Sequence, residues 1–358
     1  MARPQSKWLE QLIFLGTGTS SQVPAIHCVI GSGSDCVTCK DALRPGSFNR
    51  RGCTSAVVVG AEPGKPRSTI LIDCGKTFYQ SALTVFPKYG LERIDAVLLT
   101  HGHADAILGL DDLRSWTMGG CIQDQVDVYL TQECFETVKT TFPYLVNRSL
   151  ATGGGDVGAL RWHVVDATER FYVGPHSVPV DPLRVEHGFA GAQRLPFECL
   201  GFRIDSMSYV SDCHSIPDET KSKMLGSSVL VLDGLKMQPH TSHFSVPQAL
   251  EFALEESEEQ ISRGHKAPLV LLTDVSHRME HSATEEALQK LSAGLGGYRT
   301  NHPEATGRWW EAIWDARQNE HTSMLLLKSP MDPAENHFVP QMHLVHDFQS
   351  IEFCKNVV

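Results

Sequence analysis

Short apolar runs rich in β-branched residues recur along the chain, and polar or glycine-containing segments separate them. In the first half these runs lie at residues 12–15, 56–59, 69–72, 97–99 and 126–130. A second series begins near residue 197 and includes residues 207–210, 229–232, 269–272 and 324–327. Runs of this length and composition, bounded by turn residues, are typical of buried strands. The pattern therefore predicts two strand-rich halves.

One segment between these runs has a helical pattern. Ser245 and Gln248 have the spacing of a capping box, and Pro247 falls in the first turn. Apolar residues at 249, 250, 253 and 254 then form one face, while the acidic stretch 255–259 forms a polar one.

Strands followed by helices, twice over and without a long linker, predict one α/β domain over residues 1–358. Its expected architecture is an αββα sandwich, with two mixed sheets face to face and helices outside. Residues 151–156 and 294–307 read as loops.

Composition narrows the setting of this domain. The chain has 358 residues, 41% of them hydrophobic, and a net charge of -11 from 31 basic and 42 acidic residues. This charge disfavours a nucleic acid as partner. The N-terminus lacks an apolar signal core, and no run approaches the roughly 18 apolar residues of a membrane span. A cytoplasmic protein is expected, and its ten cysteines favour reduced thiols and metal ligation over disulfides.

The most informative chemistry lies between the apolar runs 95–99 and 107–113. The loop between them carries His101, His103 and Asp105. Two histidines two positions apart, with a carboxylate two further on, can converge on a metal when the loop is tight. Imidazole suits zinc, iron or nickel, and a carboxylate widens the choice to manganese. The sequence therefore predicts a metal site at the end of a buried strand.

This loop resembles the His-x-His-x-Asp-His signature of the metallo-β-lactamase superfamily, except that Ala106 replaces the last histidine. Residues 71–73 resemble the early strand of that family, which ends in an aspartate that supports the ligands. The resemblance implies that Asp212 bridges two metals and that Asp105 binds the second. It also implies a first metal on three imidazoles, those of His101, His103 and His187.

Most of residues 11–280 is similar to the phosphoribosyl cyclic phosphodiesterases of phosphonate degradation. The matching pieces are residues 15–19, 23–25, 28, 36–39, 49–55 and 71–73. Members of that group carry a separate structural zinc, and the resemblance implies Cys28, Cys36, Cys39 and His277 as its ligands. Three cysteines and a histidine suit a closed tetrahedral zinc site, here within an insertion loop at residues 28–39. Without Cys28 and His277, the Cys-x-x-Cys pair alone would read equally as a redox pair.

Two departures from the family pattern change the ligands of the second metal. Ala106 replaces one of its usual histidines, and Asp274 replaces the late-strand histidine. A second site on Asp105, Asp212 and Asp274 would be rich in carboxylates, which favours manganese or magnesium over zinc or weakens the site. His281 is an alternative ligand for that metal, or a solvent-facing residue.

Within this resemblance, His243 matches a histidine near the substrate phosphate, and the helix that follows it would also favour an anion. The expected function is metal-dependent hydrolysis of a small nucleotide-like or cyclic sugar-phosphate diester. Its expected cofactors are a structural zinc and one or two catalytic divalent ions, manganese or zinc. The expected catalytic residues are Asp105, Asp212 and His243.

Three other functions stay open. The same fold can act on a thioester or another carbonyl compound, since one fold hosts many chemistries. A metal-binding protein without turnover is compatible with a degraded second site. A nuclease for RNA is disfavoured by the acidic charge and by the lack of an obvious basic arm. Homodimer formation is also left open.

Overall fold

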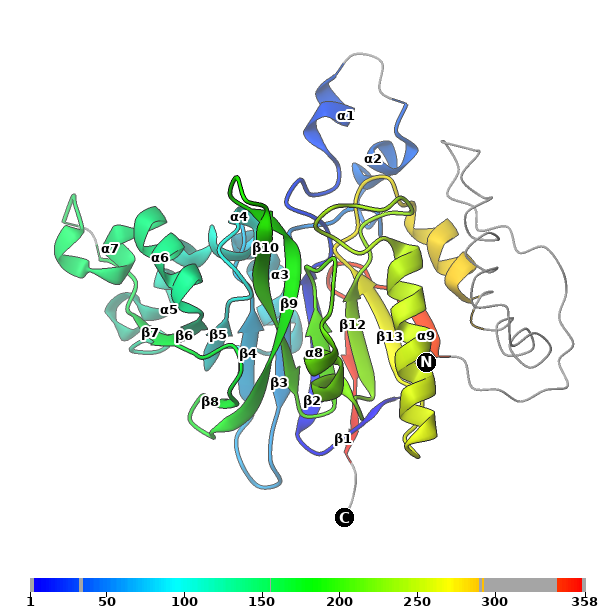
Figure 1. Ribbon diagram of the computed structural model, residues 1–358. Coiled ribbons are helices and arrows are strands. Elements are labelled where there is room, and N and C mark those ends of the chain that lie inside the picture. Colours follow the sequence, from blue (N-terminus) through cyan, green and yellow to red (C-terminus); the bar gives the residue numbers. More distant parts are fainter. Residues whose placement is uncertain (1–2, 32–34, 155, 290–291, 293–339, 356–358) are drawn as a thin grey trace, which may run out of the picture.

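The computed structural model of the protein describes residues 3–31, 35–154, 156–289, 292 and 340–355, and two seven-stranded sheets dominate it (Figure 1). The first sheet has the order β15-β2-β3-β4-β5-β6-β7. Its strands are β2 (Leu9–Gly16), β3 (Ser55–Gly60), β4 (Ser68–Ile72), β5 (Ala96–Leu98), β6 (Val126–Leu130), β7 (Leu160–Val164) and β15 (Ser350–Glu352). The second sheet has the order β14-β13-β12-β11-β10-β9-β8. Its strands are β8 (Phe171–Val173), β9 (Val178–Ala190), β10 (Leu195–Ile204), β11 (Met207–Val210), β12 (Val229–Asp233), β13 (Leu269–Thr273) and β14 (Gln341–Leu344).

Both faces of the central strands β3, β4, β12 and β13 are buried, which explains why these strands read as continuous apolar runs. In β2, Leu12 and Phe14 point into the core between the two sheets, while Ile13 and Leu15 join an outer core beneath helices. The second sheet contributes residues such as Phe202 and Tyr209 to the same central core. Successive side chains of a strand point to opposite faces of the sheet, so alternate residues pack into two different cores.

Helices cover the outer faces of the sandwich. The first sheet is followed or covered by α3 (Phe78–Tyr89), α4 (Ala104–Ile107), α5 (Arg114–Thr117), α6 (Gln132–Thr141) and α7 (Pro143–Val146). On the second sheet lie α8 (Asp218–Met224) and α9 (Val246–Ser262), whose apolar faces form a third core with that sheet. Short 3₁₀ helices occur at Leu110–Leu113, Met118–Gly120 and Arg148–Leu150.

A parallel pair, β1 (Gln5–Ser6) and β16 (Cys354–Lys355), joins the two ends of the described chain. The arrangement confirms the predicted αββα sandwich.

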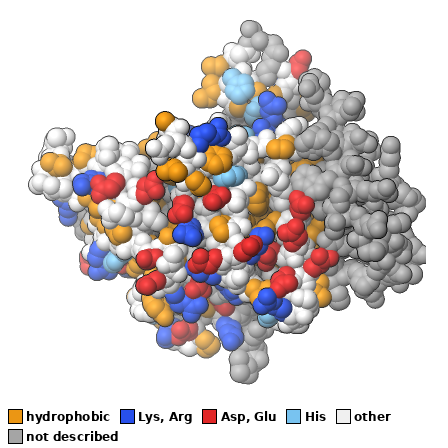
Figure 2. All heavy atoms as spheres, viewed as in Figure 1, with side chains coloured by type: hydrophobic (Ala, Val, Ile, Leu, Met, Phe, Trp, Pro, Cys, Tyr) orange, Lys and Arg blue, Asp and Glu red, His pale blue; other side chains and the backbone are white. Residues whose placement is uncertain are grey.

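A segment with α1 (Ile26–Ile30) and α2 (Val37–Ala42) projects from one end of the sandwich (Figure 1). It carries exposed apolar side chains, including Ile26 and Ile30, and hydrophobic side chains gather on this projection in Figure 2. None of the helices that the structure describes is long and apolar enough to cross a membrane.

Every predicted strand that falls within the described residues is present, and so is the helix after Ser245 with its complete capping box. The run at 324–327 and the loop at 294–307 lie outside the described residues. The segment after the His-x-His loop is divided into short helices, since α4 ends at Ile107 and a 3₁₀ helix at Leu110–Leu113 precedes α5. The cause lies at Gly109, whose amide donates to Cys74 and which approaches the Gly75 carbonyl too closely for any side chain.

Candidate metal centre

The His-x-His loop is fixed by hydrogen bonds to the loop that follows β4. Both the amide and the hydroxyl of Thr100 donate to the Asp73 carboxylate, at 2.8 and 2.9 Å. Because the Thr100 hydrogen points to Asp73, the hydroxyl oxygen accepts from His101 Nδ1 at 2.8 Å. This chain of donors leaves Nε2 of His101 facing the centre. Asp73 thus orients His101 through Thr100, which is the supporting role expected for this aspartate.

The same two loops lie backbone to backbone. The Cys74 amide donates to the carbonyl of Ala106 at 2.7 Å. A side chain on Gly75 would begin 1.6 Å from the Asp105 carbonyl oxygen, so only glycine fits there. This close approach makes the ligand-bearing loop tight enough for His101 and His103 to converge.

His187 reaches the centre from β9 in the other sheet. Its Nδ1 donates to the carbonyl of Ser242 at 2.7 Å, and its Nε2 lies 3.3 Å from Nδ1 of His103. The next residue, Gly188, has φ +77°, and a side chain there would collide with Ser242. Glycine thus allows the segment before α9 to hold the imidazole in place.

We name these three imidazoles, of His101, His103 and His187, the histidine side of the centre. One nitrogen from each lies within 4.8 Å of the other two. Nε2 of His101 is buried and has no hydrogen-bond partner. Burial lowers the pKa of His101 to about 3 and also lowers that of His187, so both imidazoles stay neutral. Neutral, convergent nitrogens with an unpartnered lone pair fit a divalent metal.

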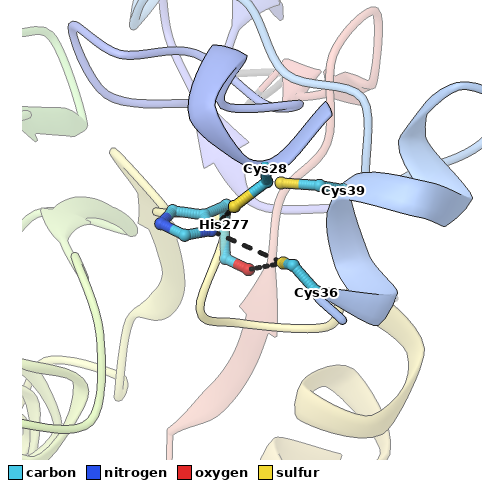
Figure 3. Close-up of side chains that lie close together, drawn as sticks. All are labelled: Cys28, Cys36, Cys39 and His277. Carbon is cyan, nitrogen blue, oxygen red and sulfur yellow. Dashed lines mark hydrogen bonds between the residues drawn. The ribbon is translucent and has the colours of Figure 1, made fainter. Parts of the chain in front are cut away.

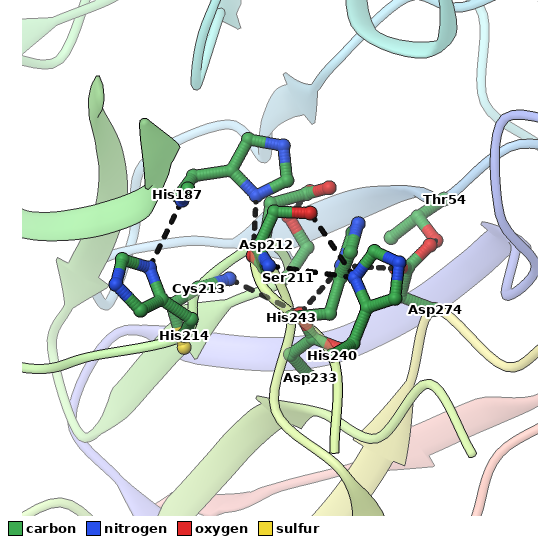
Figure 4. Close-up of polar contacts among 12 residues, drawn as sticks. Thr54, His187, Ser211, Asp212, Cys213, His214, Asp233, His240, His243 and Asp274 are labelled. Atoms are coloured by element: carbon green, nitrogen blue, oxygen red, sulfur yellow. Dashed lines mark hydrogen bonds and ion pairs between the residues drawn. The ribbon is translucent and has the colours of Figure 1, made fainter. Parts of the chain in front are cut away.

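Asp212 follows β11 and lies beside the histidine side (Figure 4). Ser211 donates to one of its oxygens at 2.7 Å. Although burial opposes ionisation, the imidazoles that surround Asp212, with the cationic His243 among them, and the hydrogen bond from Ser211 lower its pKa to about 2. A ligand atom of this ionised carboxylate lies within 4.8 Å of ligand atoms of His187 and His243, so Asp212 could join the three imidazoles in a ligand set that suits zinc or manganese.

The other half of the centre is built differently, and we name Asp233, His243 and Asp274 the carboxylate side. Nδ1 of His243 lies 2.8 Å from Asp233 and 2.9 Å from Asp274 (Figure 4). Against the effect of burial, these two carboxylates raise the pKa of His243 to about 12, while burial raises that of Asp233 to about 7. The proton therefore stays on the imidazole, which is a cation held between two carboxylates.

The structure does not gather the other predicted metal ligands into one cluster, and it places His281 away from solvent. Asp105 is largely buried with one oxygen unpartnered, but among the described residues no close cluster of three ligand atoms includes it. Asp105, Asp212 and Asp274 are not gathered into one such cluster. His281 is buried rather than solvent-facing, stacks edge-on against Phe48, and its Nδ1 lies 3.1 Å from the guanidinium of Arg51.

The predicted cysteine cluster is assembled at the base of the projecting segment. One ligand atom from each of its members lies within 4.8 Å of the others, and the members are Cys28, Cys36, Cys39 and His277 (Figure 3). Nδ1 of His277 is 3.5 Å from the sulfurs of both Cys28 and Cys36. Burial and the neighbouring thiols raise the pKa of Cys39 to about 12. A metal ion would reverse this effect, because it binds the thiolate.

One polar side chain ties the two arms of this cluster together. The amide of Asn49 donates to Asp41 in α2 and to Glu280, both at 2.9 Å, and its oxygen accepts from the amide of His281. These hydrogen bonds hold the arms that carry Cys39 and His277 next to each other.

Sequence reasoning missed two residues of the centre. Asp233 ends β12 in the way that Asp212 and Asp274 follow their strands, so the same signal was present there. Phe197 on β10 stacks on His103, with ring centroids 5.2 Å apart and planes 17° apart. No periodicity marks Phe197, because its role depends on the pairing of β9 with β10.

Two mixed sheets with helices outside form an αββα fold. Imidazoles and carboxylates gather where its strands end, and they form a candidate metal-binding centre. The chain belongs to the metallo-β-lactamase superfamily, because residues 68–265 match the family model described as "Beta-lactamase superfamily domain". Membership supports a metal-dependent hydrolase.

The chain is similar to two solved structures and to one protein of known sequence. A solved structure described as a new diphosphatase from the PhnP family is 25% identical, with a TM-score of 0.63 over 96% of this chain and 97% of that one. Zinc-bound PqqB from Methylobacterium extorquens shares the fold at 16% identity and a TM-score of 0.55, over 96% and 99% of the two chains. An octanoyltransferase of Porphyromonas gingivalis is 32% identical over 240 residues, which are 67% of this chain and 42% of that protein. The chain thus matches less than half of that relative's length.

Proposed function

We propose that the protein is a metal-dependent phosphodiesterase that acts on a small nucleotide-like or cyclic sugar-phosphate substrate. The observation that carries this proposal is the pairing of three convergent imidazoles with a fourth, His243, that lies between two carboxylates. His101, His103, His187 and Asp212 would hold a divalent ion, manganese or zinc. His243 would face a phosphate from the opposite side of Asp212.

A divalent ion at the histidine side supplies Lewis acidity that lowers the pKa of water towards neutrality. Its ligands are prepared for it, since His101 and His187 are neutral and Asp212 is ionised. His243 keeps its proton because Asp233 and Asp274 face its Nδ1. In the proposed hydrolysis, a hydroxide oxygen bonds to phosphorus, the bond from phosphorus to the leaving oxygen breaks, and that oxygen takes a proton from His243.

Several features support a small phosphorus substrate. The similar diphosphatase cleaves a phosphorus compound, as its description says. The half-buried ring of Phe197 stacks on the exposed His103 and so places an aromatic face beside the histidine side. The net charge of -11 disfavours a long polyanion. In Figure 2, acidic and basic side chains are interspersed over the face that carries α8 and α9.

The cysteine cluster has a separate role in this proposal. Cys28, Cys36, Cys39 and His277 form a closed set that would hold a structural zinc. Such a site contributes folding free energy and leaves no position for substrate.

One observation favours a second candidate, an acyl-group hydrolase. The similar protein from Porphyromonas gingivalis is named an octanoyltransferase, and a Lewis acid beside a proton donor also suits attack on a carbonyl. Since the match covers 42% of that protein, the named activity need not belong to the matched part.

A matched panel of substrates tests the two candidates. Purified protein loaded with manganese or zinc would be assayed on an aryl phosphodiester, a cyclic nucleotide, a dinucleoside diphosphate and an octanoyl thioester. Metal-dependent turnover of the phosphodiesters, lost on chelation, is expected. Turnover of the thioester alone would favour the acyl hydrolase, and no turnover with metal bound would favour a non-catalytic metal-binding protein.

A further inference from the structure

The three imidazoles of the histidine side are oriented by different means. A metal-binding histidine ordinarily uses its second ring nitrogen to hydrogen-bond another group, which fixes the ring. His101 has such an anchor in the Thr100 hydroxyl at 2.8 Å, and His187 has one in the Ser242 carbonyl at 2.7 Å. Within the part of the chain that the structure describes, the ring of His103 has one contact at hydrogen-bond distance, which joins its Nδ1 to Nε2 of His187 at 3.3 Å. That contact lies between two convergent nitrogens, so it is no anchor.

The imidazole of His103 is also the least enclosed of the three. The residue is exposed, whereas His101 and His187 are 3% and 5% exposed. Exposed side chains ordinarily change rotamer within nanoseconds, and every conformer other than the convergent one takes a ligand away from the centre. A contact other than burial or a hydrogen bond must therefore hold this ring in place.

The ring of Phe197 supplies that contact. Its centroid is 5.2 Å from that of His103 and the ring planes are 17° apart, so the two rings are stacked. The same ring lies edge-on to His101, with centroids 6.3 Å apart and planes 70° apart, and its centroid is 6.1 Å from that of His187. Phe197 thus lies against all three imidazoles, and the one that it stacks on is the one without an anchor.

A β-bulge directs this ring to the centre. The register of β9 with β10 (Figure 1) shifts between Pro196 and Glu198, where two residues of β9, His187 and Gly188, oppose Phe197 alone. Gly188 has φ +77°, a conformation that glycine adopts freely. Pro196 and Glu198 are exposed, whereas Phe197 is half-buried. Bulges beside active sites commonly re-aim a side chain, and this one turns Phe197 to the side on which His187 lies.

We propose that Phe197 is a positioning residue for metal binding, because its ring holds the imidazole of His103 in the orientation that converges with His101 and His187. This stacking takes the place of the hydrogen bonds that orient the other two imidazoles. It requires a flat aromatic face at position 197, since an aliphatic side chain fills space without fixing the plane of a neighbouring ring. The proposal rests on the proposed metal site, but it depends neither on the substrate nor on the number of ions that the centre binds.

Titration of the metal-free full chain with Mn²⁺ tests the proposal without an activity assay. Mn²⁺ is suitable because thiolates prefer softer ions, so the cysteine cluster does not compete for it. In Phe197→Leu, which keeps an apolar side chain but loses the flat face, the dissociation constant should rise about 10–100-fold, as it does when a group that orients a metal ligand is lost. Phe197→Tyr restores the face and should bind nearly as tightly as the wild type. Loss of binding in His101→Ala assigns the measured ion to the histidine side.

A control on the same hairpin separates orientation from packing. The ring of Phe189 is exposed and packs on His214, with centroids 5.2 Å apart, so Phe189→Leu should leave Mn²⁺ affinity unchanged. The melting temperatures of the metal-free Leu and Tyr variants at position 197 should be alike. Wild-type affinity in Phe197→Leu, or equal losses in Phe197→Leu and Phe197→Tyr, would overturn the role of the aromatic face alone. A wild-type chain that binds neither Mn²⁺ nor Zn²⁺ at the histidine side would overturn the proposed function as well.

Discussion

The histidine side and the carboxylate side of the centre lie next to each other, but they use titratable groups in opposite ways. On the histidine side, burial keeps His101 neutral with a pKa of about 3. On the carboxylate side, Asp233 and Asp274 keep His243 protonated with a pKa of about 12. The same side chain is thus prepared as a metal ligand in one place and as a proton donor in the other, and the neighbours decide which.

The largest effect is expected from Asp212→Ala, because Asp212 lies between the two sides. Loss of its carboxylate removes a proposed metal ligand that also lies within 4.8 Å of a ring nitrogen of His243, so phosphodiester turnover should fall to the background rate. Steady-state kinetics and metal analysis would measure this. Asp218→Ala, an exposed carboxylate at the start of α8, is the matched control and should keep full activity. An active Asp212→Ala enzyme would remove Asp212 from the centre.

A smaller loss is expected from His243→Ala. Removing a positioned proton donor should slow turnover by ~10²–10⁴, while the metal content is unchanged. The loss should shrink for substrates with good leaving groups, which need less protonation. His265→Ala, at an exposed position after α9, serves as the control. An equal loss across all leaving groups would assign His243 to substrate binding instead.

The next effect in size concerns pH. Asp233→Asn removes one of the two charges that raise the pKa of His243, and a neighbouring opposite charge is worth roughly 1–3 pKa units. Activity that requires the protonated imidazole should therefore decline at lower pH than in the wild type, by about that interval. The pH profile of kcat measures the shift. Identical alkaline limbs in the two proteins would show that Asp233 does not act through His243.

The smallest effect on turnover is expected at the cysteine cluster. Cys39→Ser should lose about one zinc per chain and lower the melting temperature, because a closed site adds folding free energy. Metal analysis and thermal unfolding would record both changes. Cys121→Ser, at an exposed cysteine outside the cluster, should change neither. Unchanged zinc and stability in Cys39→Ser would disprove the structural site.

Much of the fold could be predicted because buried strands leave a direct signal. The runs at 56–59 and 229–232 are apolar on both faces, and each became a central strand. By contrast, the first half of β9 was not predicted, since Pro179 and Pro182 fall within it and proline is disfavoured in sheets. Each proline is tolerated because it has a neighbouring strand on one side only. Pro179 pairs with Tyr172 of β8 and lies beyond the register with β10, whereas Pro182 pairs with Phe202 of β10 and lies beyond the register with β8.

Part of the candidate site could also be predicted from the sequence, and part of it could not. His101, His103 and the four members of the cysteine cluster were found from spacing and family resemblance, and the structure brings them together. The ion pair between Asp274 and His243 could not be predicted, since it depends on the direction of a side chain at φ +56°. Sequence therefore indicated which residues reach the centre, whereas the structure shows which of them are already engaged with one another.

Anomalous diffraction from crystals of the full chain grown with Mn²⁺ would test the central claim most directly. The account predicts a manganese peak at His101, His103, His187 and Asp212, and a separate zinc peak at the cysteine cluster. Crystals grown with Mn²⁺ that show no manganese peak beside these three imidazoles would contradict it.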